Sequence, residues 1–223
     1  MWTRSKEELA SLTPEKALEI LVEGNKRFVN NYKINRNLLQ QVNETSDTQL
    51  PIAIILSCID SRTSSELIFD QGLGDIFNAR VAGNVINEDI LGSMEYACKV
   101  VGSKLILVLG HTKCGAVKGA CNDVKLGNLT QLLAKIEPAV AFAKTEPLQL
   151  ADQSVFTEKV AKANVLLTMA DIKRKSPVLN ELIVSGAIKL VGGMQNIESG
   201  KVDLFTESGE NILKHEMKSE LKF

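Results

Sequence analysis

The sequence predicts an α/β fold with a mainly parallel central β-sheet, an antiparallel edge strand, flanking helices and an N-terminal helical arm. Short, continuously apolar runs typical of strands buried on both faces alternate with longer segments of helical periodicity. The last strand candidate, residues 201–205, instead alternates polar and apolar side chains, as an edge strand does. We expect a single domain over residues 1–223, with the arm at 1–34, the α/β core at 51–206 and a charged tail at 207–223.

The N-terminal arm is predicted from its helix signals. Thr13 precedes Pro14, a combination typical of an N-cap followed by proline in the first helical turn. Apolar residues then recur near the helical period over residues 17–28, and Asn30–Asn31 ends the run. Such a helix packs either on the main body or on a partner subunit. The polar stretch 35–48 predicts a loop or a weak helix.

The core elements follow in alternation. Strands are expected at 52–56, 75–81, 105–109, 187–191 and 201–205, with glycines closing the third and the fourth. Helical segments are expected at 64–69, 89–101, after Cys114, from about 129 to 174 with breaks near Pro138 and Pro147, and from Ser176–Pro177 onward. In a parallel sheet of this kind, functional sites form beyond the carboxyl ends of the strands.

Charge and composition exclude several classes of function. The chain has 26 Lys and Arg and 27 Asp and Glu, so its formal net charge is −1. This balance argues against binding nucleic acid or an anionic membrane through bulk charge, and only 4% of the residues are aromatic, too few for base-stacking platforms. No apolar run approaches the roughly 20 residues that span a bilayer, and the first residues lack the apolar stretch of a signal peptide. We therefore expect a cytoplasmic protein whose cysteines are thiols or metal ligands, without nucleic-acid or membrane partners.

Chemistry-bearing residues follow two of the predicted strands. The first strand runs into Cys58-Ile59-Asp60-Ser61-Arg62, and the third runs into His111-Thr112-Lys113-Cys114. Because the carboxyl ends of parallel strands meet at one edge, two cysteines, a histidine and a carboxylate should share one crevice. These are the ligand types that zinc prefers, and three ligands with a fourth position left for water or Asp60 are typical of a catalytic site. A lone histidine at a strand end is more often structural, but the nearby cysteines favour metal binding here, whereas His215 lies in the charged tail and is expected at the surface.

These two motifs resemble the signature of the β-class carbonic anhydrases. The similarity runs from about residue 13 to residue 205 and includes Gly24–Phe28, Gly74–Phe77, Arg80–Asn84, Ser93–Ala97 and Gly200–Val202. The resemblance implies a zinc ion in each chain, held by Cys58, His111 and Cys114. It also implies reversible hydration of carbon dioxide to bicarbonate and a proton, through attack by a zinc-bound hydroxide.

The resemblance further implies roles for residues around the metal. Asp60 orients the hydroxide and Arg62 holds Asp60, whereas in a closed state Asp60 would itself coordinate the zinc. Four residues are implied in substrate binding: Gln49, Phe77, Gly115 and Tyr96. In plant-type members the glutamine often acts across a subunit interface. The implied partners are carbon dioxide and bicarbonate, with the chain assembled as a homodimer or homotetramer.

Three other functions stay open on the residues alone. Relatives in the superfamily hydrolyse carbon disulfide or carbonyl sulfide with the same ligands, so the ligands do not distinguish these substrates. A structural or sensory zinc module would need Asp60 as a permanent fourth ligand, which leaves Arg62 and Gln49 without a purpose. A redox protein that uses Cys58 and Cys114 is disfavoured because the sequence lacks a Cys-x-x-Cys motif.

Overall fold

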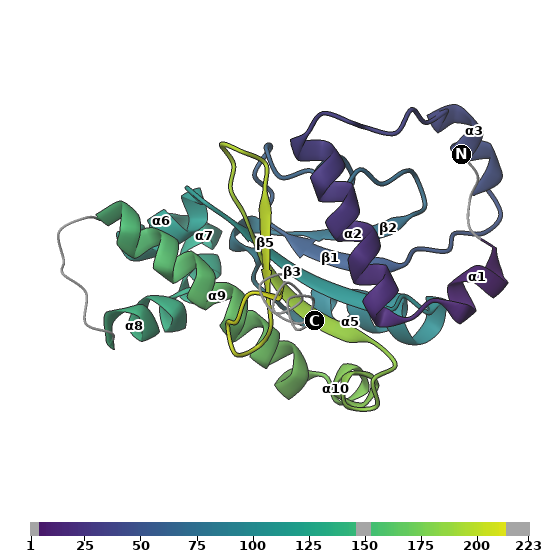
Figure 1. Ribbon diagram of the computed structural model, residues 1–223. Helices are drawn as coiled ribbons and strands as arrows, with labels where there is room; N and C mark the ends of the chain where they lie inside the picture. Colours follow the sequence, from purple (N-terminus) through teal and green to yellow (C-terminus); the bar gives the residue numbers. More distant parts are fainter. Residues whose placement is uncertain (1–4, 146–152, 213–223) are drawn as a thin grey trace, which may run out of the picture.

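The structure is a computed structural model that describes residues 5–145 and 153–212. Its strands are β1 (Ala53–Ser57), β2 (Ile76–Arg80), β3 (Leu105–His111), β4 (Lys189–Gln195) and β5 (Val202–Phe205). They form one sheet in the order β2-β1-β3-β4-β5 (Figure 1). Strands β1 to β4 pair in parallel, and β5 runs antiparallel beside β4. The predicted mainly parallel sheet with an antiparallel edge strand is therefore confirmed.

Helices flank the sheet. The N-terminal helices are α1 (Lys6–Ser11), α2 (Pro14–Val29) and α3 (Leu38–Glu44). Between the strands lie α4 (Ser65–Ile68), the 3-10 turn η1 (Ala82–Asn84), α5 (Glu88–Glu95), the π-helical segment η2 (Tyr96–Val101), α6 (Gly115–Cys121), α7 (Gly127–Ala134), α8 (Glu137–Thr145), α9 (Gln153–Lys175) and α10 (Pro177–Val184). Figure 1 shows α6, α7 and α8 gathered at one end of the molecule, and α1 and α3 toward the other.

The two faces of the sheet are covered by different helices, because side chains alternate along each strand. Ile54 and Leu56 of β1 pack with residues of α5, α9 and α10, whereas Ile55 packs with residues of α1 and α2. A third apolar cluster joins α6, α7, α8 and α9, and it includes Cys58 and Cys114. The cysteines that follow the strands thus rest on a packed apolar layer.

β3 and β4 run further than the sequence predicts. The glycines expected to close them lie inside the strands, so β3 extends to His111, and β4 begins at Lys189 and extends to Gln195. A Cβ at Gly110 would lie 2.7 Å from Val165 Cγ2, and one at Gly192 would lie 2.4 Å from a ring carbon of Phe205. Close packing therefore requires these glycines, and they do not end the strands.

The helices agree with the predictions in type, with some differences in extent. The polar stretch 35–48 does form a helix, α3, because the Asn37 side chain accepts a hydrogen bond from the Gln40 N–H at 3.1 Å and caps it. The helical region 129–174 divides into α7, α8 and α9, with a break just before Pro138. Pro147 and most of the predicted charged tail lie outside the described residues.

The N-terminal helices pack on the body of the protein. Leu9 of α1 and Leu18 and Leu21 of α2 are buried in the cluster on one face of the sheet. The Thr13 side chain accepts a hydrogen bond from the Lys16 N–H at 3.2 Å, as expected of an N-cap. The sequence leaves open whether this helix packs on the main body or on a partner subunit, and in the structure α2 packs on the main body.

A buried ion cluster fastens the segment that follows α2. Asp70 is 4% exposed, and its carboxylate accepts Arg27 Nε at 2.5 Å and Arg36 Nη1 at 2.5 Å. The Ile34 N–H also donates to Asp70 Oδ2, at 3.3 Å. Burial by itself would raise the pKa of Asp70, but the hydrogen bonds from Arg27 and Arg36 more than offset it, so the pKa lies below its usual value.

We expect Asp70→Asn to lower the free energy of unfolding by about 3–5 kcal/mol at neutral pH, because it leaves the buried Arg36 without a counter-charge. Since the folded-state pKa lies below the unfolded value, the carboxylate contributes fully above about pH 4, and its contribution is lost as the pH falls through the folded pKa. Denaturant unfolding of both proteins from about pH 7 to pH 3.5 measures the difference. A difference that stays constant over the whole range would contradict this explanation.

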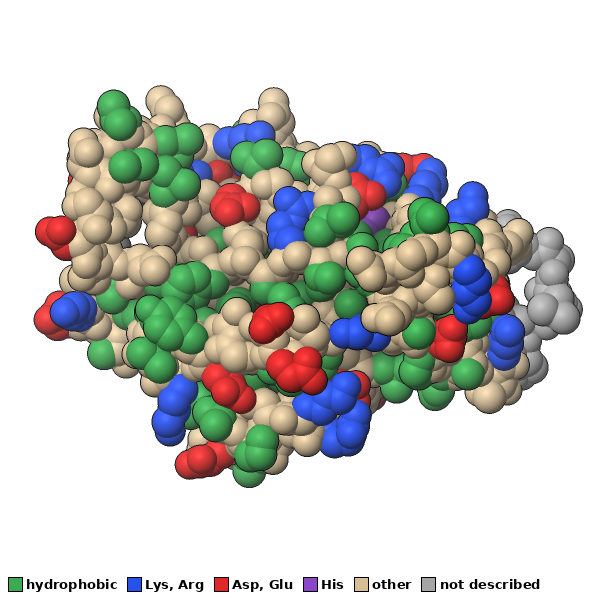
Figure 2. All heavy atoms as spheres, turned by 180° about the vertical axis from the view of Figure 1, so that it is seen from behind, with side chains coloured by type: hydrophobic (Ala, Val, Ile, Leu, Met, Phe, Trp, Pro, Cys, Tyr) green, Lys and Arg blue, Asp and Glu red, His purple; other side chains and the backbone are tan. Residues whose placement is uncertain are grey.

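The surface carries charges of both signs. On the face shown in Figure 2, basic and acidic side chains are interspersed, with hydrophobic side chains between them. This distribution agrees with the formal net charge of −1. Among the described residues, no helix combines the length and the apolar character needed to cross a membrane.

Candidate metal centre

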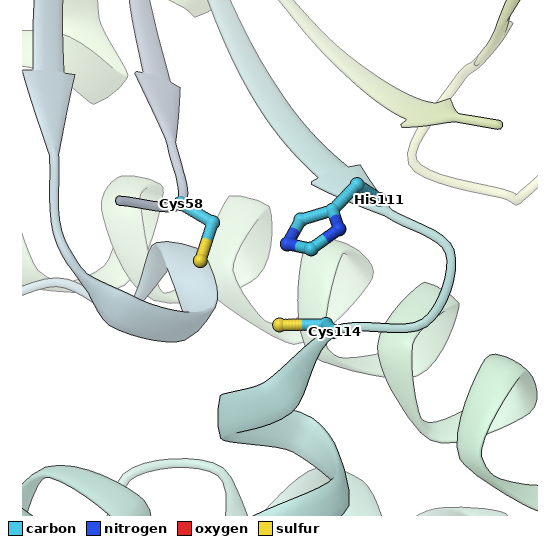
Figure 3. A group of neighbouring side chains, drawn as sticks. All are labelled: Cys58, His111 and Cys114. Carbon is cyan, nitrogen blue, oxygen red and sulfur yellow. The ribbon is translucent and has the colours of Figure 1, made fainter. Parts of the chain in front are cut away.

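Cys58, His111 and Cys114, here called the metal triad, meet beyond the carboxyl ends of β1 and β3 (Figure 3). Cys58 directly follows β1, His111 is the last residue of β3, and Cys114 directly precedes α6. Their ligand atoms all lie within 4.8 Å of one another, and all three residues are buried. Because zinc binds thiolate sulfur at about 2.3 Å and imidazole nitrogen at about 2.0–2.1 Å, side chains this close fit one ion.

The turn after β3 is fixed by two other elements. Lys113 adopts a left-handed φ of 55°, and its N–H donates to Glu158 Oε1 of α9 at 2.7 Å. The Thr112 N–H donates to the main-chain oxygen of Gln195 at 2.9 Å, which continues the contact with β4 past the end of β3. These contacts hold His111 and Cys114 on the same side of the turn.

His111 presents an unused ring nitrogen to the other two ligands. Its Nδ1 lies 2.9 Å from the Thr112 carbonyl oxygen, and because a carbonyl only accepts, Nδ1 carries the proton. Nε2 is buried and has no hydrogen-bond partner among the described residues. Such a group costs about 1–3 kcal/mol when it is left unsatisfied. A metal ion would satisfy it, so both the donor set and this tautomer fit zinc.

The two thiols of the triad influence each other's ionisation. The adjacent Cys114 thiol, with a further contribution from the nearby His111 ring, lowers the pKa of Cys58 to about 4. The same contact with Cys58, together with burial, raises the pKa of Cys114. Burial alone would lower the pKa of His111, but the neighbouring Cys58 thiolate raises it. A bound dication would change this balance, because a metal-coordinated thiol is deprotonated.

Asp60 and Arg62 form a bidentate ion pair beside the triad. Arg62 Nε donates to Asp60 Oδ1 at 2.9 Å, and Arg62 Nη2 donates to Oδ2 at 2.8 Å. The Arg62 main-chain N–H also donates to Oδ1, at 3.0 Å. The side-chain hydrogen bonds from Arg62 hold the pKa of Asp60 well below its usual range. Asp60 Oδ2 lies 4.0 Å from His111 Nε2, so an ionised carboxylate borders the metal triad.

Two further residues hold the segment that carries Cys58 and Asp60. Arg80, the last residue of β2, donates from Nε to the Cys58 carbonyl at 3.0 Å and from Nη2 to the Asp60 carbonyl at 2.7 Å. The Gly83 N–H donates to Cys58 Sγ at 3.3 Å. Sequence reasoning assigns neither residue a role. The sequence signal that could have singled them out is their place in the Arg80–Asn84 segment, which is one of the segments that carry the family resemblance.

Three of the four predicted substrate-binding residues lie apart from the triad within one chain. Gln49 is exposed and precedes β1, at the opposite end of that strand from Cys58. Phe77 and Tyr96 lie together, with ring centroids 6.3 Å apart, and line a cavity of about 730 Å³ formed mainly by β2 and α5. No triad residue lines that cavity. Gly115, which directly follows Cys114 in α6, adjoins the triad.

Comparison with known proteins agrees with this geometry. Residues 53–202, which include the metal triad and most of the sheet, match the family model for carbonic anhydrases. The chain belongs to the carbonic anhydrase family. It is therefore an enzyme of the carbonic anhydrase type, and the expected family is confirmed.

Known carbonic anhydrases are similar to the chain over most of its length. Carbonic anhydrase 2 of Mycobacterium tuberculosis is 35% identical over 204 residues, which cover 88% of this chain and 95% of that protein. The carbonic anhydrase of Mycolicibacterium smegmatis is 31% identical over 203 residues, covering 88% and 96%. The solved structure of the β-carbonic anhydrase CcaA aligns with a TM-score of 0.70 at 26% identity, over 87% of this chain and 91% of that one. These similarities assign the chain to the β class.

Proposed function

We propose that this carbonic anhydrase hydrates carbon dioxide to bicarbonate and a proton, reversibly, with zinc held by Cys58, His111 and Cys114. The observation that carries the proposal is one site that combines two buried thiols, an unpartnered His111 Nε2 and the Arg62-bound carboxylate of Asp60. Family membership supports the reaction. The donor set supports zinc, because three ligands of these types leave a fourth position open, as catalytic zinc sites do.

Zinc bound by the triad would act as a Lewis acid and lower the pKa of a water molecule from about 15.7 toward about 7. The chain's own contribution is to aim the resulting nucleophile. Asp60 Oδ1 accepts two hydrogen bonds from Arg62, whereas Oδ2 accepts one and lies toward His111. Oδ2 therefore keeps a lone pair that can accept a hydrogen bond from the attacking oxygen and orient it toward carbon dioxide.

Arg62 has a second task, which is to hold the Asp60 carboxylate away from the metal. A free carboxylate only 4.0 Å from His111 Nε2 would itself be a suitable zinc ligand and would occupy the fourth position. The guanidinium fork engages both carboxylate oxygens at once, which a point charge would not do. The Asp60–Arg62 pair therefore favours the open site over the closed one.

We also propose that substrate binding uses a second copy of the chain, in a homodimer or homotetramer. Gln49 lies at the wrong end of β1 to reach its own triad, and Phe77 and Tyr96 line a separate cavity. If these side chains bind substrate, a neighbouring subunit must supply them. Light scattering during size-exclusion chromatography is expected to give a dimer or a tetramer, and a fully active monomer would contradict this proposal.

Metal-free protein is expected to gain carbon dioxide hydration activity in proportion to added zinc, up to about one ion per chain. Stopped-flow assays with a pH indicator between about pH 6.5 and 9 give the rate, and elemental analysis gives the zinc content. Zinc-loaded protein that is inert over this whole range would overturn the proposal. It would then be assayed with carbon disulfide, since the same ligands serve that chemistry.

A further inference from the structure

A hydrogen-bond relay links Cys58 to the middle of α9. The Gly83 N–H donates to Cys58 Sγ at 3.3 Å, and the Gly83 carbonyl accepts from Asn164 Nδ2 at 2.8 Å. The N–H of Gly83 therefore binds the Cys58 sulfur, and the carbonyl of Gly83 binds the Asn164 amide. Asn164 is 3% exposed and Gly83 is buried, so bulk water does not compete for these hydrogen bonds.

The packing around Gly83 leaves its backbone little freedom. Gly83 has a left-handed φ of 69°, and a Cβ there would lie 2.6 Å from Ile136 Cδ1 and 3.3 Å from Ala116 Cβ. The next residue, Asn84, also has a positive φ, of 44°, which is uncommon for residues other than glycine. Such a backbone persists only where its surroundings hold it, and the hydrogen bond from Asn164 is one of those constraints.

We propose that Asn164 is a positioning residue of the metal centre, an inference that rests on zinc binding by the triad as proposed above. By holding the Gly83 carbonyl, Asn164 keeps the Gly83 N–H on the sulfur of Cys58. Groups that are hydrogen-bonded to metal ligands orient those ligands and tune the electron density they donate, and their loss typically costs about 10–100-fold in metal affinity or activity. Asn164 acts on the ligand through Gly83 and needs no contact with substrate.

Nuclear magnetic resonance of protein loaded with spin-active cadmium tests the relay directly. A scalar coupling across the N–H···S contact is expected between the cadmium and the Gly83 amide proton. Asn164→Leu removes the donor and keeps the same branched heavy-atom skeleton, so the coupling should weaken or vanish, and chelator competition should show a zinc affinity about 10–100-fold lower. A coupling and an affinity that both match the wild type would overturn the proposal.

Asn25→Leu is the matched control. Asn25 is 7% exposed, and its Nδ2 donates to the carbonyls of Ile68 at 3.1 Å and Gly200 at 3.0 Å, so the same chemistry is lost away from the metal. This variant should lose stability but keep the Gly83 coupling and a zinc affinity within about twofold of the wild type. An equal loss of affinity in both variants would indicate general destabilisation and would overturn the role of Asn164. If Asn164→Leu does not fold, Asn164→Asp takes its place, because it keeps the shape and removes the amide donor.

The outcomes for Asn164 and for the proposed function are separable. A wild-type protein that hydrates carbon dioxide, together with an unchanged zinc affinity in Asn164→Leu, would leave the proposed function standing and overturn the role of Asn164. A wild-type protein that binds neither zinc nor cadmium at the triad would overturn both.

Discussion

Arg62→Ala is expected to lower kcat/KM for carbon dioxide hydration by about 10²-fold or more, the usual scale when a reacting group is misplaced by an ångström. Arg62 supplies every hydrogen bond that the described residues make to the Asp60 carboxylate, two of them from its side chain. Without the guanidinium, Asp60 loses the contacts that aim it, and it lies close enough to His111 to compete for the fourth metal position. Zinc content should stay unchanged, because no triad residue is altered.

Two companion variants make the Arg62 result specific. Arg62→Lys keeps the charge but loses the planar fork, so we expect it to recover only part of the rate. Arg174→Ala removes another arginine that is paired with an aspartate, Asp171, on the exposed surface of α9, and it should leave the rate unchanged. Stopped-flow kinetics on zinc-assayed protein compare the three. A rate for Arg62→Ala within about twofold of the wild type would exclude a role for the pair in orienting the nucleophile.

The fold was predictable where one physical signal dominates. Buried strands such as β1 are continuously apolar because helices cover both faces of the sheet, and that pattern is visible in the sequence alone. The carboxyl ends of β3 and β4 were not predictable, because a glycine signals a turn and a close contact equally well. At Gly192 the deciding neighbour is Phe205, which the antiparallel pairing of β5 with β4 places directly opposite it.

The candidate site likewise has residues that the sequence predicts and residues that it does not. Cys58, His111 and Cys114 each sit at the end of a strand or just beyond it, so the topology of a parallel sheet was enough to bring them together. Gln49 precedes β1, at the opposite end of the strand from Cys58, so within one chain it lies apart from the metal triad. Asn164 lies within a long helix whose sequence carries no local motif, and its role depends on a tertiary contact with Gly83. Residues that support a site from a distance are accessible only through the three-dimensional structure.

Cys58→Ala is expected to abolish both stoichiometric zinc binding and hydration activity, with the rate falling by about 10³-fold or more. Lewis-acid stabilisation is worth several kcal/mol, and each 1.36 kcal/mol corresponds to about tenfold in rate. The remaining His111 and Cys114 would provide two ligands, fewer than the three that catalytic zinc sites use. Elemental analysis of dialysed protein and stopped-flow kinetics measure the two losses together, and circular dichroism checks that the variant remains folded.

Cys121→Ala provides the control that separates loss of a ligand from loss of a thiol. Cys121 is the last residue of α6, partly exposed, and outside the metal triad, so this variant should keep its zinc and its rate. If Cys58→Ala retained zinc and activity, the metal would have to be bound elsewhere. If it retained zinc but lost activity, Asp60 would be the natural replacement ligand, because its carboxylate already borders the triad. The proposed site requires that zinc and activity disappear together in Cys58→Ala and persist together in Cys121→Ala.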